Sequence, residues 1–395
     1  MKKIILYIIL CHLIIAQSSI KIYNQGWALV KEDRNENLQK SGEQLLFIYD
    51  LPLNIDPASI NVSSETINFL SKEYIYKPIT INNLLYENIG NEIQLVRYNN
   101  NENSKSSISA KLISYTDIPI FEIDNKIVID PPYNYEFPNI PYTLKDNPYI
   151  ECKINSSTKN ANYVLNYLLK GISWGAEFNL YINSDNTSEV QGWYFIKNSN
   201  NYSYKMMETS LVSGNINFFN QKQVRLTSPT TRTASSNYQI SVDKEPQFYN
   251  TEDYYIYKIP EKINLSRHSE FRYKFLEKKE VDYTNIYHVS HQLSRYKRYN
   301  TKKTEKIPVN IRLEIDAKNI GNFQLPSGNY YVYEKDDTEI TFIGADKNKI
   351  VSEKNKIKLE IGKSHEILST FTIMGMEIDK NKGKIDLEAK FDNNK

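Results

Sequence analysis

The sequence predicts an all-β protein made of two to three antiparallel β-sandwich or barrel-like domains, with very little helix. Two observations carry this prediction. Apolar and polar residues alternate in many segments, as they do along half-buried strands. The composition is also rich in Tyr and poor in Gly, with 31 Tyr and 13 Gly among 395 residues. Because aromatic and β-branched residues favour strands, this composition disfavours helices.

The clearest strand pattern runs over residues 307–315, where Ile, Val or Leu occupies every second position. The same alternation recurs over 176–183, 357–361 and 385–391. Turn-forming pairs such as Asp124-Asn125 separate these runs. A helix start is indicated only at Asn82-Asn83, before two Leu residues, and the helix that it predicts is short.

Residues 1–16 read MKKIILYIILCHLIIA, a basic start followed by an apolar run that ends at Ala16. This pattern is typical of a secretory signal peptide, and the run is shorter than the about 20 residues that a bilayer span needs. An uncleaved N-terminal anchor is the alternative. Cleavage near Ala16 predicts an exported protein, periplasmic, at the cell surface or secreted, with no transmembrane span in the mature chain.

Three β domains are expected after the signal peptide: an N-terminal domain over 17–150, a central domain over 151–300 and a C-terminal domain over 301–395. Within the first, residues 92–130 should form a compact run of strands with a hairpin at Asp124-Asn125. The Pro- and Tyr-rich segment 131–148 should be extended and poor in pairing. It serves as the predicted linker at the end of this domain.

Charge and cysteine content exclude several classes of function. The formal net charge is +2, and removal of Lys2 and Lys3 with the signal leaves none, so we expect no nucleic-acid partner. The basic and aromatic stretch 295–306 could bind an acidic polymer, but such stretches are more often solvated loops. Cys152 alone remains after cleavage, and its alternation with Ile150 and Ile154 predicts a buried strand residue.

Two motifs are suggestive of chemistry. Gly171 to Gly175 matches the G-x-S-x-G nucleophile elbow, but a strand pattern follows it where the elbow needs a helix. We therefore interpret it as a strand entry with Trp174 in the core. His288 and His291 are three residues apart, and in a strand they would point to opposite faces. We expect no metal and no cofactor, and no catalytic residue is assigned.

The abundant Tyr residues are the remaining lead to a binding site. Tyr combines apolar area with a hydroxyl at low entropic cost, so exposed clusters favour contact with peptides or sugars. Packing between neighbouring strands is the alternative that we favour. The candidate binding residues are Tyr133, Tyr135, Tyr142, Tyr254, Tyr255 and Tyr257.

An ordered set of short motifs runs from about residue 20 to 365. It includes Gly26 and Trp27, Pro57, Gly171 with Ser173 and Trp174, Gly192 with Trp193, and Pro326 with Gly328. In this order the set resembles domain-of-unknown-function family 4139, exported bacterial proteins of which some are labelled mucoidy-inhibitor-like. The resemblance implies a β-rich protein outside the cytoplasm and motif residues with a structural role. It brings no established activity, cofactor or catalytic residue.

These observations favour a non-enzymatic structural or interaction module of the cell envelope, whose partner is an envelope protein or glycan. The alternative is a secreted or periplasmic hydrolase or glycan-active enzyme with unidentified catalytic acids. The carboxylates of a glycosidase come from distant positions in the chain, so the sequence alone does not distinguish these two functions.

Overall fold

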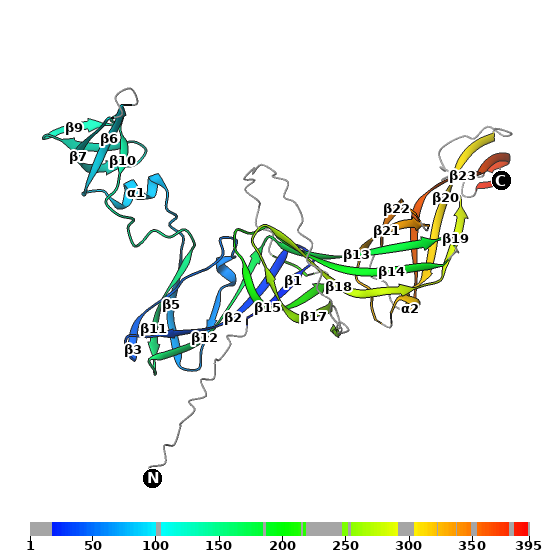
Figure 1. Ribbon diagram of the computed structural model, residues 1–395, viewed down its shortest axis with the longest axis horizontal. Coiled ribbons are helices and arrows are strands. Elements are labelled where there is room, and N and C mark those ends of the chain that lie inside the picture. Colours follow the sequence, from blue (N-terminus) through cyan, green and yellow to red (C-terminus); the bar gives the residue numbers. More distant parts are fainter. Residues whose placement is uncertain are drawn as a thin grey trace, which may run out of the picture. The chain divides into compact units, whose positions relative to one another are not determined.

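The computed structural model describes residues 18–99, 104–184, 187–214, 216–218, 247–251, 254–290, 304–321, 323–336, 338–348, 354–378 and 383–393. About 69% of the described residues are in strands and 5% in helices, which confirms the predicted all-β class (Figure 1). The predicted signal peptide, the segment 295–303 and His291 lie outside the described residues.

The chain divides into two compact units. Unit 1 holds Leu29–Lys170 and the short return segment Asn200–Tyr202, whereas unit 2 holds Ser19–Ala28, Gly171–Ser199 and Ser203–Lys395. The domain boundary predicted at residue 150 falls inside a strand of unit 1, and the one predicted at residue 300 lies outside the described residues. Pairing between distant segments places the division elsewhere than the linker composition indicated.

Unit 1 contains a three-stranded antiparallel sheet of order β3 (Gly42–Ile48), β11 (Tyr149–Ser156) and β5 (Ile67–Ile75). The strand β12 (Asn160–Lys170) follows β11 in the chain. In its own sheet it is hydrogen-bonded between β2 (Trp27–Asn37) and β4 (Asn61–Ser63). The short 3-10 helix η1 (Pro57–Ser59) precedes β4. Cys152 on β11 is completely buried, as expected, and burial raises the pKa of its thiol to about 11.

A small five-stranded sheet in unit 1 has the order β10 (Asn134–Glu136), β6 (Glu92–Asn99), β7 (Ser104–Tyr115), β8 (Pro119–Ile123) and β9 (Lys126–Ile129). Its β8–β9 hairpin turns at Asp124 and Asn125, with φ of 51° and 60°. Positive φ at both central residues is what a type I′ turn requires, so the predicted hairpin is confirmed. The helix α1 (Ile81–Glu87) starts at the N-cap Thr80, whose hydroxyl accepts from Asn83 N.

Unit 2 is built on a five-stranded sheet of order β18 (Ser269–Glu280), β14 (Ser188–Asn198), β13 (Ile172–Asn183), β21 (Gly328–Lys335) and β22 (Ile340–Asn348). A four-stranded sheet has the order β19 (Tyr283–His288), β20 (Thr304–Asp316), β23 (Lys356–Ile378) and β24 (Gly383–Asn393). The strands β16 (Gln247–Thr251), β17 (Tyr254–Leu265), β15 (Tyr204–Ser213) and β1 (Ser19–Tyr23) are neighbours in that order, and α2 (Ala317–Ile320) follows β20.

The strand β1 pairs with β15 in parallel, and β13 pairs with β21 in parallel. They depart from the antiparallel arrangement that the sequence predicts. Parallel neighbours need a long crossover connection, and here each pair joins segments more than a hundred residues apart. Alternation within one strand carries no information about the direction of a distant neighbour, so the sequence pattern could not reveal these pairs.

Aromatic side chains fill the core of unit 2. Tyr194 stacks on Phe275 with ring centroids 4.0 Å apart, and Phe178 stacks on Tyr330 at 4.3 Å. Trp174 lies edge-on to Tyr194, and its indole Nε1 donates to the carbonyl of Val212 at 3.1 Å. This packing confirms the buried strand face expected at Ala176, Phe178 and Leu180.

Across the described residues, no helix combines the length and apolarity needed to cross a bilayer.

Candidate functional site

The outward side of the five-stranded sheet of unit 2 carries an unusual set of aromatic and amide side chains. Alternate residues of a strand point to opposite faces, so the burial of Ala176, Phe178 and Leu180 places their neighbours on the outward side. We call this surface the aromatic–amide face. Its members are half-buried and come from β13, β14 and β21: Glu177, Asn179, Tyr181, Gln191, Trp193, Asn329, Tyr331 and Tyr333.

Strand register arranges these residues in rows across the sheet. Glu177 lies between Trp193 and Asn329, and Asn179 lies between Gln191 and Tyr331. Cross-strand neighbours of this kind have Cβ atoms about 5 Å apart and therefore touch. One row holds three aromatic or amide side chains and the other holds two beside Glu177, so these residues form a continuous surface rather than isolated exposed residues.

Direct contacts hold the rings of the aromatic–amide face in place. Tyr181 stacks on Tyr333 with centroids 5.4 Å apart, and the Tyr181 hydroxyl accepts from Gln191 Nε2 at 3.2 Å. On the next strand, Lys274 Nζ lies 5.1 Å from the centre of the Trp193 ring, a cation–π contact. Burial raises the pKa of Tyr333, and the neighbouring Tyr181 raises it further, so this hydroxyl stays protonated.

The charged residues on this face and beside it are paired. Arg272 forms an ion pair with Glu177 and another with Glu270 at 2.8 Å. Burial lowers the pKa of Arg272, but these carboxylates outweigh burial and raise it. In contrast, the amides of Asn179 and Asn329 form no side-chain hydrogen bond with any other residue that the structure describes. The row of Gln191, Asn179 and Tyr331 therefore offers neutral donors and acceptors beside an aromatic ring.

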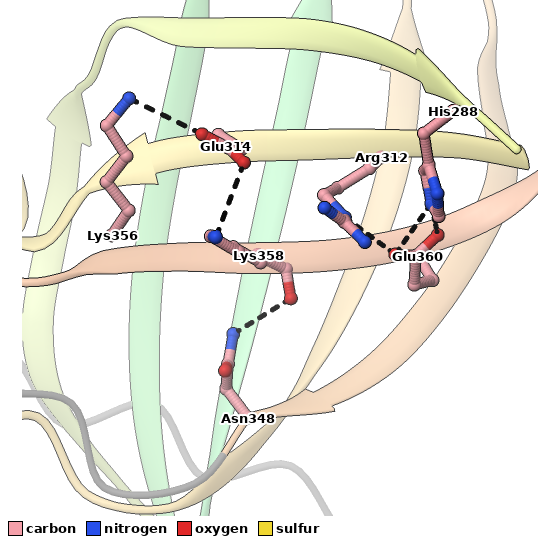
Figure 2. Close-up of polar contacts among 7 residues, drawn as sticks. All are labelled: His288, Arg312, Glu314, Asn348, Lys356, Lys358 and Glu360. Carbon is pink, nitrogen blue, oxygen red and sulfur yellow. Dashed lines mark hydrogen bonds and ion pairs between the residues drawn. The ribbon is translucent and has the colours of Figure 1, made fainter. Parts of the chain in front are cut away.

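A second polar cluster lies on the four-stranded sheet, as Figure 2 shows. His288 on β19 and Arg312 on β20 both contact the carboxylate of Glu360 on β23, at 2.8 Å and 2.6 Å. Partial burial raises the pKa of Glu360, but the hydrogen bonds from His288 and Arg312 outweigh it, so this pKa is lowered. Because both carboxylate oxygens are engaged, Glu360 is held as an ionised partner and not as a free base.

Further ion pairs lie along the same strands, where Glu314 is 3.4 Å from Lys356 and 3.8 Å from Lys358 (Figure 2). Asn348 Nδ2 donates to the Lys358 carbonyl at 3.4 Å. We interpret this cluster as a set of cross-strand ion pairs that stabilises the sheet. In the part of the chain that the structure describes, no group of three or more His, Cys, Asp and Glu could hold a metal ion.

The candidate binding tyrosines are dispersed. Tyr133 and Tyr135 pack against the core of the small sheet of unit 1, and Tyr142 is 87% exposed. Tyr254 and Tyr255 are half-buried on β17. Tyr257 is 1% exposed and contacts Trp174, so its ring has no surface to offer a ligand, which corrects the expectation that it takes part in binding. The structure does not bring these six residues together.

Most family-motif residues occupy structural positions. Gly26 and Gly171 have φ of 82° and 90°, a backbone conformation that favours glycine, and Trp27 stacks on Phe218 at 5.1 Å. Ser173 lies on β13, which continues as a strand to Asn183, so the helix that a nucleophile elbow needs is not there.

The remaining motif residues lie at tightly packed positions or at the start of an element. Pro57 begins η1, Pro326 is buried, and a Cβ at Gly192 would meet the Phe275 ring at 2.7 Å. At Gly328 a Cβ would lie 2.7 Å from the Ala176 carbonyl oxygen. Trp193 differs from these residues because it points outward into the aromatic–amide face.

The aromatic–amide face is not predicted from the sequence as a site. The alternation over 176–183 indicates a buried side, and Trp193 belongs to the motif residues interpreted as structural. The signal was present in the residues between the buried ones, where Asn, Gln and Tyr replace the charged residues typical of a solvated sheet face. Only the order of strands shows that these residues are adjacent.

Comparisons of this chain with protein-family models, with curated proteins and with solved structures found no match. Its function must therefore be argued from the chemistry of the site.

Proposed function

We propose that this chain is an exported, non-enzymatic module of the cell envelope that binds a glycan on its aromatic–amide face. One observation carries the proposal: Trp193, Tyr331 and the amides Asn179 and Gln191 lie in adjacent rows on an outward sheet face. The resemblance to exported proteins of domain-of-unknown-function family 4139 and the N-terminal signal pattern support its envelope location.

The chemistry of this face suits a sugar chain. Each sugar ring has an apolar C–H side, which packs on aromatic rings, and hydroxyl groups, which need donors and acceptors in fixed positions. Asn and Gln supply both kinds of group, and their neutrality avoids the cost of desolvating a charge. The carboxylates of Glu177 and Glu189 are engaged in ion pairs with Arg272 and Lys278, so the neighbouring row of Gln191, Asn179 and Tyr331 suits a neutral ligand.

The geometry also supports binding more than catalysis. Glycoside hydrolysis requires a pair of carboxyl groups facing the same bond, with one of them held protonated. On this face the carboxylate of Glu177 forms an ion pair with Arg272 and is already engaged. The aromatic–amide face therefore offers a platform with stacking rings and amides, which recognises a ligand without reacting with it.

The proposal is tested by the binding of purified protein to soluble fragments of envelope polysaccharides, followed by calorimetry. Trp193→Ala and Asn179→Ala should each weaken binding about tenfold or more, since central aromatic and buried polar contacts dominate small interfaces. Tyr142→Ala is the matched control, because Tyr142 is an exposed aromatic in unit 1. Unchanged affinity in Trp193→Ala, or no binding to any of the polysaccharides, would refute the glycan proposal.

Export is tested separately by fractionation of cells that produce the full chain. We expect the protein outside the cytoplasm and an intact mass that begins shortly after Ala16. A cytoplasmic protein that retains Met1 would contradict the proposed location and leave the binding measurement unaffected.

A further inference from the structure

The last described strand of the four-stranded sheet has an apolar side that the described residues leave exposed. In the order β19-β20-β23-β24, the strand β24 pairs with β23 and forms the end of the sheet among the described strands. Its residues Ile385, Leu387, Ala389 and Phe391 share one side, as the sequence pattern predicts. However, Leu387 is 45% exposed and Phe391 is 57% exposed, whereas such a pattern normally marks a buried face.

The opposite side of β24 carries a series of five charged residues of both signs. In chain order these are Lys384, Asp386, Glu388, Lys390 and Asp392. Lys384 lies 3.5 Å from Asp386 within the same strand. The side chains of Lys390 and Asp392 form no ion pair with other residues of the described chain, so their charges are free to meet another molecule.

An end strand with exposed backbone groups is a template for pairing with another strand. Suppose that β24 pairs antiparallel with β24 of a second copy. Each step forward along one strand is then a step back along the other, so the residue numbers of every facing pair add up to the same value, and this value defines the register. Registers that set an odd position against an even one place apolar residues beside charged ones and are disfavoured. The remaining registers near the centre of the strand differ in which charges face one another.

One of these registers pairs opposite charges at every position of the charged side except the two-fold axis, where Glu388 meets its own copy. With Glu388 opposite Glu388 of the second copy, Lys384 faces Asp392 and Asp386 faces Lys390, and each pair occurs twice by symmetry. On the apolar side, Ile385 then faces Phe391 and Leu387 faces Ala389. A slip that centres the pairing on Leu387 sets Lys384 against Lys390 and Asp386 against Glu388. A slip centred on Ala389 sets Asp386 against Asp392.

We propose that β24 is a self-association strand, through which two copies of this chain join their four-stranded sheets about a two-fold axis at Glu388. The charge series favours an antiparallel copy of the same strand in this register, because the neighbouring slips set like charges against each other away from the axis. The exposed Leu387 and Phe391 gain cross-strand apolar neighbours in the dimer. This surface is on a different sheet from the aromatic–amide face, so it is independent of the proposed glycan binding.

Charge exchange tests the pairing. In sedimentation analysis of the purified protein over micromolar to millimolar concentrations, Lys390→Asp should raise the dimer dissociation constant about tenfold or more, since it sets Asp against Asp386. Lys390→Asp combined with Asp386→Lys should restore it. Lys111→Asp, the same change on an exposed strand of unit 1, is the control. Restoration in the double variant separates loss of pairing from loss of folding.

A disulfide test fixes the register. Glu388→Cys brings two thiols opposite each other, with Cα atoms about 5 Å apart, a distance that a disulfide spans. Lys384→Cys places its thiol opposite Asp392, far from the other copy of itself, and should not cross-link. A monomer at every concentration, or cross-linking of Lys384→Cys as fast as of Glu388→Cys, would overturn the proposal.

Discussion

The stability of unit 1 should be sensitive to substitution of Arg34, because its guanidinium contacts two backbone carbonyls and one carboxylate. Its Nη1 donates to the Tyr49 carbonyl at 2.6 Å and its Nη2 to the Asp50 carbonyl at 3.3 Å. Nη2 also lies 2.6 Å from Glu32, which accepts a further hydrogen bond from the Tyr167 hydroxyl. Burial lowers the pKa of Arg34, but Glu32 outweighs this effect and raises it.

We predict that Arg34→Met lowers the free energy of unfolding of unit 1 by about 3 kcal/mol. The side chains of Arg34 and Glu32 are only 17% and 14% exposed, so removing one partner leaves a charge with little access to water. Breaking a buried pair in this way costs about 3–5 kcal/mol, and the residual exposure favours the lower end. Arg34→Lys should lose about 1–2 kcal/mol, because an ammonium group cannot reach both carbonyls and the carboxylate at once.

The assay is urea denaturation followed by far-UV circular dichroism. Trp27, Trp174 and Trp193 are the only tryptophans of the chain, and all lie in unit 2, so the transition seen by tryptophan fluorescence serves as an internal reference. Arg34→Met combined with Glu32→Met should recover most of the loss, since no unpaired charge remains. A loss below about 1 kcal/mol in Arg34→Met, or a double variant worse than the sum of the two single ones, would refute this reasoning.

Three further predictions concern unit 2. Gly328→Ala should destabilise the protein by about 2 kcal/mol or more in thermal unfolding, because its Cβ would lie 2.7 Å from a backbone oxygen that has no room to move; an unchanged melting temperature would contradict this. Tyr330→Phe should raise the unfolding free energy by about 1 kcal/mol, since its buried hydroxyl has no hydrogen-bond partner among the described residues, and a loss of stability would show that the hydroxyl is satisfied. The pKa of Glu360 is lowered in the folded protein. Its contribution to the free energy of unfolding is therefore present above the pKa of this group in the unfolded chain, and it disappears as the pH falls through the pKa in the folded protein. The stability difference between the wild type and Glu360→Gln, less than about 1 kcal/mol for this partly exposed pair, should therefore shrink as the pH falls below the ordinary pKa of a glutamate and vanish once Glu360 is protonated in the folded state. A difference that grows on acidification would exclude this linkage.

Strand identity could be predicted from the sequence because it depends on neighbouring residues. The alternation over 176–183 and 307–315 marks which side chains are buried, and Asp124-Asn125 is a local turn signal. The short helix was predicted close to its true position for the same reason, although the N-cap proved to be Thr80. All of these features are decided within a few residues of chain.

The candidate site could not be predicted in this way. Trp193 and Tyr331 belong to segments that are far apart in sequence, and they share a face only because β13 pairs with β14 on one side and with β21 on the other. Tyr257 shows the reverse case, since its position in a Tyr-rich stretch suggested a surface role but packing against Trp174 buries it. Composition cannot separate these outcomes, because Tyr suits both a core and a binding surface.

By itself the sequence determined the class of fold, the faces of individual strands and the tight hairpin, all of which follow from local sterics and from the alternation of side chains along a strand. Only the tertiary structure decided the division into two units, the parallel pairing of β1 with β15 and of β13 with β21, and which outward residues meet on one sheet. The physical reason is that strand pairing uses backbone groups common to every residue, so the choice of a distant partner depends on the packing of the whole chain.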